Sequence, residues 1–327
     1  MTTPAMTVLR AQYPAAQIVV LANPLVAELF KVHPAADRVI VYDKKGCHRG
    51  LKGLWRLTQQ LRQERFDAAV LLQNAIEAAL IAWLAGIPRR AGYTTDGRRL
   101  LLNYPVTLQA ADKRRHHTDY YLHLLQQLGL TFSQSVSLSL QCSASERQWA
   151  RQQLGGVSPI AVNPGAAYGS AKRWLPERFA AVADALAEQC HCGIVLTGGP
   201  GEHEIGAEIE AAMTAKPINL IGKTSVRQMM AVLAESRLLV TNDSGPMHVA
   251  AAFDVPIVAV FGSTDHTTTS PASDRVRIVR KPFDCAPCLK RQCPTDHRCM
   301  LAIEADEVIA AALEVLEQQQ DVAGGRS

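Results

Sequence analysis

The sequence predicts an α/β protein built from two doubly wound domains, each with a parallel sheet covered by helices. Short apolar runs typical of strands alternate with amphipathic runs typical of helices, and the alternation starts afresh near residue 158. Near-continuous apolar strands joined by helices indicate a parallel sheet that is buried on both faces. The chain has 327 residues, about the length of two domains of ~100–200 residues each. We therefore expect domains at 1–150 and 151–327.

The first domain begins with a helix-like segment, followed by a β-branched run. Residues 51–64 repeat leucine every three or four positions, which is the spacing of one helix face. The remaining elements follow from the same two periodicities. The expected set is strands at 17–22, 38–43, 66–74 and 88–93, and helices at 24–32, 51–64 and 75–86.

The second domain repeats the pattern after a connecting helix, for which Ser143 and Glu146 form a candidate capping box. Its last helix follows a cysteine-rich loop, and the final residues 321–327 are expected to fray. The expected strands are 158–165, 192–197, 218–222, 237–243 and 256–262, with helices at 177–189, 226–236, 245–254 and 305–320.

Composition and charge narrow the class of protein. No apolar run approaches the ~18 residues of a membrane span, and the N-terminus lacks the pattern of a secretory signal, so a cytoplasmic location is expected. Residues 1–150 contain 18 Lys and Arg against 10 Asp and Glu, whereas the rest of the chain is net acidic. This asymmetry predicts an anionic partner for the first half, or else reflects chance scatter of surface cations. Nucleic acid is disfavoured, because only 6% of residues are aromatic and no stacking motif accompanies the cations.

Two loops after predicted strands of the second domain lie at the edge where doubly wound folds bind ligands. Residues 163–174 are glycine-rich and contain Lys172, so backbone N–H groups and one cation would approach a phosphate. Their spacing matches neither the Walker loop nor the dinucleotide fingerprint. Residues 197–204 form a glycine turn, and Glu204 would accept hydrogen bonds from ribose hydroxyls. The alternative for both is an ordinary turn with an exposed side chain.

A third loop, 241–248, joins a strand to a helix through Asp243, Ser244 and Gly245 and places His248 on the first helical turn. The N–H groups and the dipole of a helix N-terminus attract anions. Alternatively, Asp243 caps the helix and His248 is an ordinary helical histidine. Because three such loops follow strands of one domain, they would converge on one crevice. Together they indicate a bound diphosphate flanked by groups that bind hydroxyls.

These loops, NPGAAYGSAKRW, LTGGPGEHE and VTNDSGPMHVAAA, resemble the C-terminal half of the lipopolysaccharide heptosyltransferases, glycosyltransferase family 9. In the first half, FDAAVLLQN, AGIPRRAGY and LLN match as well, so the resemblance covers nearly the whole chain. The form P-G-A-x-x-G-x-A-K-R-W is most similar to the type II enzymes of the family. The resemblance implies a GT-B architecture, two Rossmann-like domains facing across a cleft.

The resemblance also implies the reaction. The C-terminal domain would bind ADP-L-glycero-D-manno-heptose, and the N-terminal domain would bind the lipopolysaccharide inner core, heptosyl-Kdo2-lipid A, at the inner face of the inner membrane. Heptose would be transferred with inversion at its anomeric carbon, and ADP would leave. No cofactor is required, because Lys172 and backbone amides would meet the charge on the leaving group. The alternatives are transfer of another nucleotide sugar by the same fold, or a non-catalytic sugar-nucleotide-binding protein.

Site residues follow from the loops and the resemblance. Lys172 and His248 are the expected catalytic residues, Glu204 would hold the ribose, and Gly222 and Thr224 lie where the family places adenine. The expected donor-binding set is Gly165, Lys172, Glu204, Gly222, Thr224, Asp243, Ser244, Gly245 and His248. Because the acceptor carries phosphates and acidic sugars, the candidate acceptor face is the basic set Arg89, Arg90, Arg98, Arg99, Lys113, Arg114 and Arg115.

Two features stand apart from this scheme. Cys285, Cys288, Cys293 and Cys299 have a spacing compatible with a structural zinc site, with free thiols or with a disulfide. The N-terminus opens on a helix, whereas a doubly wound domain normally opens on a strand. Family members begin with a strand and a Gly-Asp loop before the Thr-Pro-Ala seen here at residues 3–5, and that Asp is the family's proposed general base. We therefore expect a truncated chain that lacks the base, is poorly stable and is inactive.

Overall fold

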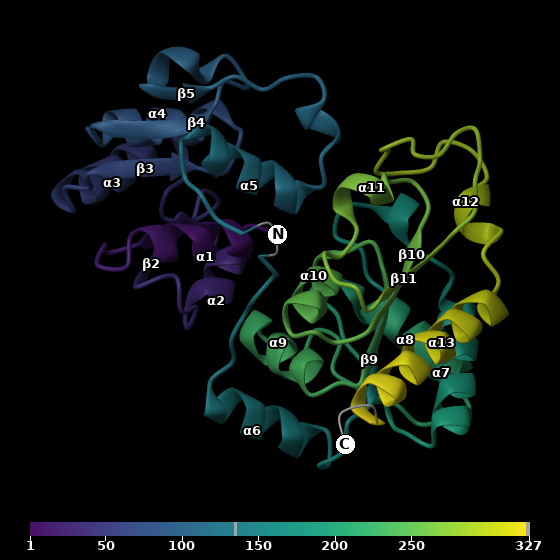
Figure 1. Cartoon of the computed structure of the whole chain (residues 1–327). Coiled ribbons are helices and arrows are strands. Elements are labelled where there is room, and N and C mark those ends of the chain that lie inside the picture. The colour runs from purple at the N-terminus through teal and green to yellow at the C-terminus, as the bar shows by residue number, and fades with distance from the viewer. Residues whose placement is uncertain (134–135, 325–327) are drawn as a thin grey trace. The chain divides into compact units, whose positions relative to one another are not determined.

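The computed structural model describes residues 1–133 and 136–324 and divides the chain into two compact units, Met1–Val136 and Ser137–Ser327 (Figure 1). Both units are of the α/β class, and every strand pairing within them is parallel. Among the described residues, none of the helices combines the length and the hydropathy that a bilayer-spanning helix needs.

Unit 1 opens on a helix, as expected, and then alternates strands and helices. The strand β5 and the helix α5 of this unit were not predicted from the sequence. The elements are α1 (Thr3–Gln12), β1 (Val19–Ala22), α2 (Pro24–Phe30), β2 (Arg38–Val41), α3 (Gly50–Gln63), β3 (Ala68–Leu71), α4 (Ile76–Leu84), β4 (Arg89–Tyr93), the 3-10 turn η1 (Arg98–Leu101), β5 (Tyr104–Val106), the 3-10 turn η2 (Asp112–Arg114) and α5 (His117–Gln127).

The strands of unit 1 form two sheets, β1-β2 and β3-β4-β5, that share the same helical layers. On one face, α1 packs Met6 in a cluster with Val20 of β1 and Val8 in a cluster with Val70 of β3. On the other face, residues of α3 and α4 form one apolar cluster with residues of β1, β2 and β3. The helices therefore join the two sheets into one core.

Unit 2 contains the longer sheet. Its elements are α6 (Ala144–Gln153), β6 (Ile160–Asn163), η3 (Ser170–Lys172), α7 (Pro176–Cys190), β7 (Ile194–Leu196), η4 (Pro200–Glu202), α8 (His203–Ala212), β8 (Ile218–Asn219), α9 (Val226–Ala234), β9 (Leu238–Asn242), α10 (Gly245–Ala252), β10 (Ile257–Phe261), α11 (His266–Thr269), β11 (Val276–Arg280), α12 (Arg298–Leu301) and α13 (Ala305–Gly324). The edge strand β11 was missed because arginines interrupt its apolar pattern.

The strand order of unit 2 determines where its loops meet. The order is β11-β10-β9-β6-β7-β8, so the chain runs outward from β6 through β7 and β8 and then returns to the other side of β6. The topological switch point therefore lies between β6 and β9. In open α/β sheets, the crevice beyond the carboxyl ends of the strands at such a point is where ligands bind. Asn163, the last residue of β6, is in register with Thr241 of β9.

The boundary between the units lies at residues 136 and 137, earlier than the expected 150 and 151, because α6 packs against α9 of unit 2. The predicted capping box of Ser143 and Glu146 is confirmed at the start of α6. Glu146 also accepts hydrogen bonds from Arg227 of α9, with Nε 2.7 Å from Oε1. Arg147 and Arg151 of α6 both pair with Glu235. These ion pairs connect residues more than 80 positions apart, and no local pattern predicts them.

The Glu146–Arg227 pair gives a testable pH dependence. Hydrogen bonding to Arg227 lowers the pKa of Glu146 from 4.5 to about 2. A carboxylate whose pKa falls on folding stabilises the fold above its unfolded pKa and loses that contribution as pH falls through the folded value. Glu146→Gln should therefore destabilise unit 2 by about 2–3 kcal/mol at neutral pH. The deficit should shrink below pH 4.5 and vanish near pH 2.

Thermal melting of both proteins across that range measures the difference. Glutamine keeps an acceptor for the capping box, so the comparison isolates the charge. Glu208→Gln, at an exposed position of α8, is the matched control and should leave the melting temperature unchanged. A Glu146→Gln deficit that is the same at neutral and acidic pH would refute the ion-pair explanation.

Candidate active site

Lys172 and Asp243 meet at the switch point of unit 2. Lys172 ends the turn η3 after β6, and Asp243 directly follows β9. The Lys172 Nζ lies 2.6 Å from the Asp243 Oδ2, and the two side chains are 13% and 6% exposed. Thr264, in the loop after β10, donates a hydrogen bond to the same carboxylate oxygen. The ends of three adjacent strands thus converge on one ion pair, as predicted for the loops at 163–174 and 241–248.

The helix α10 begins immediately beside this pair. Its N-cap is Ser244, whose side chain makes no capping hydrogen bond, and Pro246 occupies its first turn. The carboxylate of Asp243 is engaged by Lys172 and Thr264. The alternative in which Asp243 caps the helix is therefore wrong. The helix N-terminus keeps the partial positive charge that attracts an anion, and the half-buried His248 lies on this first turn.

Buried amide and hydroxyl side chains form a hydrogen-bond network next to the Lys172–Asp243 pair. The Ser244 Oγ donates to the Asn163 Oδ1 over 3.3 Å and lies 3.1 Å from the Thr241 Oγ1. Asn242 is 0% exposed; its amide donates to the Pro164 carbonyl and accepts from the Trp174 backbone N–H. Asn242 thereby holds both ends of the loop that carries Lys172. A satisfied buried network of this kind fixes geometry.

The cysteine-rich segment, which sequence reasoning left outside the site, docks on the Lys172 loop. The Ala171 N–H donates to the Arg291 carbonyl over 3.0 Å, and His297 Nε2 lies 3.1 Å from the Ala171 carbonyl. At Gly169, any Cβ would stand 2.1 Å from the Arg291 carbonyl. Only glycine therefore permits this approach.

Arg291 adds a second cation to the site. Two cations contact the ring of Tyr168. The Lys172 Nζ lies 4.8 Å from the ring centroid, and the Arg291 guanidinium carbon lies 5.3 Å from it. The two cations therefore lie within about 10 Å of each other, a distance that one diphosphate and its flanking sugars can bridge. Arg291 is exposed and makes no ion pair among the residues that the structure describes. Its position 119 residues along the chain from Lys172 left no local signal.

The second glycine loop presents Glu202 rather than Glu204 toward the first loop. A Cβ at Gly165 would lie 1.8 Å from the Glu202 Oε1, so the carboxylate rests against the loop after β6. The Glu202 Oε2 also accepts from the Gly199 N–H at 2.7 Å. Glu204 lies exposed on the first turn of α8. The acid that lies against the loop after β6 is therefore Glu202, two residues before the expected Glu204, because the turn η4 directs it inward.

The loop after β8 carries the two residues expected near adenine. The Gly222 N–H donates to the Gly198 carbonyl over 3.0 Å, which joins this loop to the second glycine loop. The imidazole of His203 packs directly on Gly222, and Thr224 is half-buried. Gly222 is thus held beside the loop that carries Glu202, whereas no described contact links Thr224 to either.

The basic residues of unit 1 fall into three groups. Arg98 is 0% exposed and donates to the backbone carbonyls of Tyr93, Gln73 and Ala75. Burial lowers the pKa of its guanidinium. Arg90 is half-buried and donates to the carbonyls of Leu101 and Ile87. The assignment of Arg98 to an exposed acceptor face is therefore wrong, because its side chain is fully buried and its Nε and Nη1 groups donate to backbone carbonyls of unit 1. The assignment of Arg90 stays a prediction.

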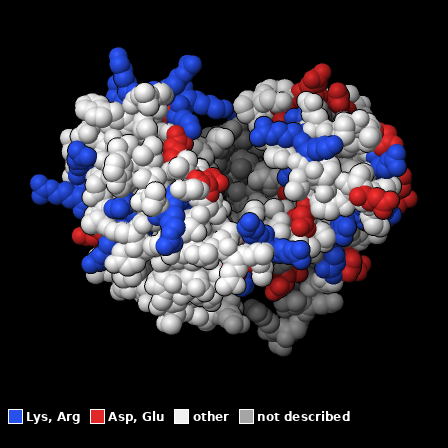
Figure 2. Space-filling model, turned by 90° about the horizontal axis from the view of Figure 1, so that it is seen from above, with Lys and Arg blue, Asp and Glu red and all other residues white. Residues whose placement is uncertain are grey.

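The other candidates are at the surface. Arg115 is exposed but pairs with the buried Asp112 at 2.9 Å. The rest are exposed without an ion pair in the described part of the chain: Arg89, Arg99, Lys113 and Arg114. Figure 2 shows basic side chains projecting from the surface in blue. These four are the candidates that are both exposed and free of an ion pair among the described residues, and the acceptor face itself stays a prediction.

The four cysteines of the segment 285–299 are free thiols, so the disulfide alternative is wrong for this structure. No group of three or more His, Cys, Asp or Glu side chains that could hold a metal ion occurs among the described residues. The described residues therefore contain no preformed zinc site at these cysteines, and the zinc alternative stays a prediction. Burial raises the pKa of the Cys299 thiol, whereas hydrogen bonding to Thr295 lowers the pKa of the Cys293 thiol.

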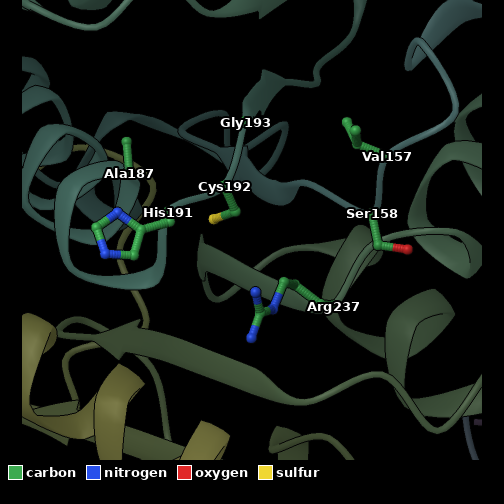
Figure 3. A pocket seen from close by; sticks show the side chains of 7 residues that line it. All are labelled: Val157, Ser158, Ala187, His191, Cys192, Gly193 and Arg237. Carbon is green, nitrogen blue, oxygen red and sulfur yellow. The ribbon is translucent and has the colours of Figure 1, made fainter.

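The pocket of about 600 Å³ in unit 2 lies at the opposite edge of the sheet. Its lining residues precede β6, β7 and β9 and include Ser158, Cys192 and Arg237 (Figure 3). Burial raises the pKa of the Cys192 thiol. Ligands of doubly wound folds bind at the carboxyl ends of strands, so this pocket at the amino ends is not the active site.

Comparison with known proteins agrees with the geometry. The family model described as glycosyltransferase family 9 (heptosyltransferase) matches residues 54–298. Lipopolysaccharide heptosyltransferase 2 of Escherichia coli (strain K12) is 32% identical over 295 residues, covering 83% of this chain and 81% of that protein. Lipopolysaccharide heptosyltransferase 2 of Salmonella typhimurium (strain LT2) is 33% identical over 293 residues, covering 83% of this chain and 81% of that protein.

Solved structures share the fold over nearly the whole chain. The structure of E. coli ADP-heptose LPS heptosyltransferase II gives a TM-score of 0.81 at 28% identity, covering 98% of this chain and 95% of that chain. The glycosyl transferase family 9 structure from Veillonella parvula gives 0.85 at 28% identity, covering 97% and 93%. The GT-B fold class of two Rossmann-like units is confirmed. The chain belongs to glycosyltransferase family 9 and is a glycosyltransferase.

Proposed function

We propose that this enzyme transfers L-glycero-D-manno-heptose from its ADP derivative to the heptosyl-Kdo2-lipid A core of lipopolysaccharide. The observation that carries the proposal is the Lys172–Asp243 pair beside the N-terminus of α10, at the switch point of a doubly wound sheet. The relatives named as lipopolysaccharide heptosyltransferase 2 support the substrate class.

The proposed chemistry is an inverting displacement. An acceptor hydroxyl attacks the anomeric carbon of heptose and releases its proton to solvent. The bond from that carbon to the phosphate oxygen breaks, and ADP leaves with the bonding electrons. Charge then develops on the diphosphate, and fixed donors placed there lower the barrier. Lys172, Arg291 and the backbone N–H groups of Ser244 and Gly245 supply these donors. We therefore propose that no metal ion is required.

The same pair also orients the sugar. In the absence of ligand, Lys172 lies on Asp243; a bound diphosphate would share the ammonium. The carboxylate, already fixed by Thr264, would then accept hydrogen bonds from heptose hydroxyls, with His248 on the same helical turn as a second partner. On the nucleoside side, Glu202 replaces Glu204 as the proposed ribose acceptor, and Gly222 and Thr224 remain the proposed adenine contacts.

The acceptor side of the proposal uses unit 1. The four exposed cations defined above would bind the phosphates and acidic sugars of the inner core. Since the proposed acceptor is anchored in lipid, the enzyme would work as a peripheral protein on the inner face of the inner membrane, in contact with lipopolysaccharide and not with nucleic acid.

Ligand-dependent melting and transfer assays test the proposal. ADP and ADP-heptose should raise the melting temperature. A ligand at a hundredfold excess over its Kd adds about 2.7 kcal/mol to the free energy of unfolding. UDP-sugars should not raise the melting temperature. Transfer of heptose to purified heptosyl-Kdo2-lipid A should be retained in chelator. Stabilisation by a UDP-sugar with no response to ADP would instead indicate a different nucleotide sugar. Stabilisation without transfer would indicate the non-catalytic binding protein, in agreement with the inactivity expected from the sequence.

Arg291 provides a sharper test of the donor site. Arg291→Ala should raise the KM for ADP-heptose roughly tenfold, because a charge-assisted hydrogen bond to phosphate contributes about 1.5–3 kcal/mol. Its backbone carbonyl, which anchors Ala171, is unaffected by the substitution. Lys290→Ala, at the neighbouring exposed position, is the control. Equal KM values for the two variants would remove Arg291 from the donor site.

A further inference from the structure

The helix α3 of unit 1 exposes large apolar side chains that the core does not use. Leu51 is 86% exposed and Trp55 is 66% exposed. They are four residues apart, so they form one row along the helix surface. The opposite face of α3 buries Leu57 and Leu61 in the core of unit 1. The fold therefore fixes the helix by one face and leaves the apolar row in solvent.

A row of cations runs beside this apolar row. Lys52 and Arg56 are exposed and are also four residues apart, and the preceding turn adds the exposed Lys45 and Arg49. Neighbouring cations are neutralised, since Lys44 pairs with Glu77 and Arg38 with Glu64. No ion pair within the described part of the chain involves Lys45, Arg49, Lys52 or Arg56. We call Lys45, Arg49, Leu51, Lys52, Trp55 and Arg56 the α3 patch.

The α3 patch has the composition of a helix that lies on a membrane. Such helices combine basic residues with Trp and Leu, and their apolar row enters the boundary between headgroups and acyl chains. Tryptophan favours that boundary because its ring is apolar and its N–H is polar. Clustered Lys and Arg gain attraction from anionic headgroups. Single-stranded nucleic acid would need several stacking aromatics, whereas Trp55 is the one aromatic residue of the patch.

We propose that the α3 patch docks this enzyme on the surface of an anionic bilayer. The partner is the lipid surface itself, recognised by its negative charge and its interfacial apolar layer. The inference rests on the proposed function only in the choice of partner, because a lipid-anchored acceptor places the enzyme at a membrane. It requires no occupancy of the donor site, so it can fail or succeed separately from heptose transfer.

Vesicle sedimentation of the full chain, without substrates, tests the inference. The enzyme should bind phosphatidylcholine vesicles that contain phosphatidylglycerol and should bind pure phosphatidylcholine vesicles weakly. Lys52→Gln with Arg56→Gln should weaken binding to the anionic vesicles roughly tenfold or more, since each cation contributes about 1 kcal/mol. Leu51→Ala with Trp55→Ala should weaken it comparably. The matched controls are Leu25→Ala, at a 69% exposed leucine of α2, and Lys216→Gln, at an exposed lysine of unit 2.

Fluorescence locates the contact, and kinetics separate it from catalysis. Brominated phosphatidylglycerol should quench the tryptophan emission of the enzyme, and Trp55→Phe should abolish most of that quenching although three other tryptophans remain. The apolar double variant should keep full transfer to a soluble, deacylated acceptor and lose rate on vesicle-bound acceptor. Unchanged vesicle binding in both double variants would overturn the inference, as would binding of an oligonucleotide through the patch without any binding to vesicles.

Discussion

Lys172→Ala should lower kcat by roughly 10²–10³-fold while the fold survives, because one fixed donor to the developing charge is lost. The ammonium is held by Asp243 at 2.6 Å and by the ring of Tyr168 at 4.8 Å. It is therefore positioned before substrate binds, and no reorganisation is needed at the moment of reaction. Steady-state kinetics with saturating ADP-heptose measure the effect. His248→Ala should also reduce transfer.

The variant needs a control for charge, because Lys172 is the cation paired with Asp243, whose side chain is 6% exposed. Its removal leaves that carboxylate with the hydroxyl of Thr264. An unpaired buried charge is strongly destabilising. Adding Asp243→Asn should restore the melting temperature of Lys172→Ala without restoring transfer. Lys216→Ala, at an exposed site, should change neither quantity. Near-normal kcat in Lys172→Ala would remove this residue from the chemistry.

Arg98→Ala is expected to destabilise unit 1 by about 3–5 kcal/mol, the cost of disrupting a buried, hydrogen-bonded charged group. The arginine fixes the carboxyl ends of β3 and β4, since it donates to Tyr93 at the end of β4 and to Gln73 and Ala75 after β3. Alanine would leave those carbonyls without their donors and would open a cavity. Chemical denaturation measures the loss.

The adjacent exposed Arg99 supplies the matched control. Arg99→Ala should change stability by no more than about 0.5 kcal/mol, as is usual at the surface. If Arg99 belongs to the acceptor face, its loss should raise the KM for the acceptor, and high salt should diminish that difference because exposed charges are screened over ~8 Å. Similar stability of the two variants would contradict the structural role given to Arg98.

Local patterns in the sequence determined most of the architecture and the position of the site. The alternation of apolar and amphipathic runs reflects burial within each element, so it predicted two doubly wound units and the strands β6, β9 and β10. Lys172, Asp243 and Ser244 were placed correctly at strand ends because parallel strands bring their carboxyl ends to one edge. The capping box at α6 was equally local, since all of its hydrogen bonds lie within four residues.

Only the tertiary structure decided which side chains face the carboxyl edge of the sheet and which are buried in the core. Arg98 and Arg99 are neighbours with the same chemistry, yet the turn η1 buries the first and exposes the second. Glu202 and Glu204 differ only by the direction that η4 gives the chain. The docking of Arg291 on the Lys172 loop and of α6 on α9 joins segments about 80–120 residues apart. Such contacts depend on packing between distant segments, so the hydrophobic periodicity of a short stretch of sequence cannot predict them.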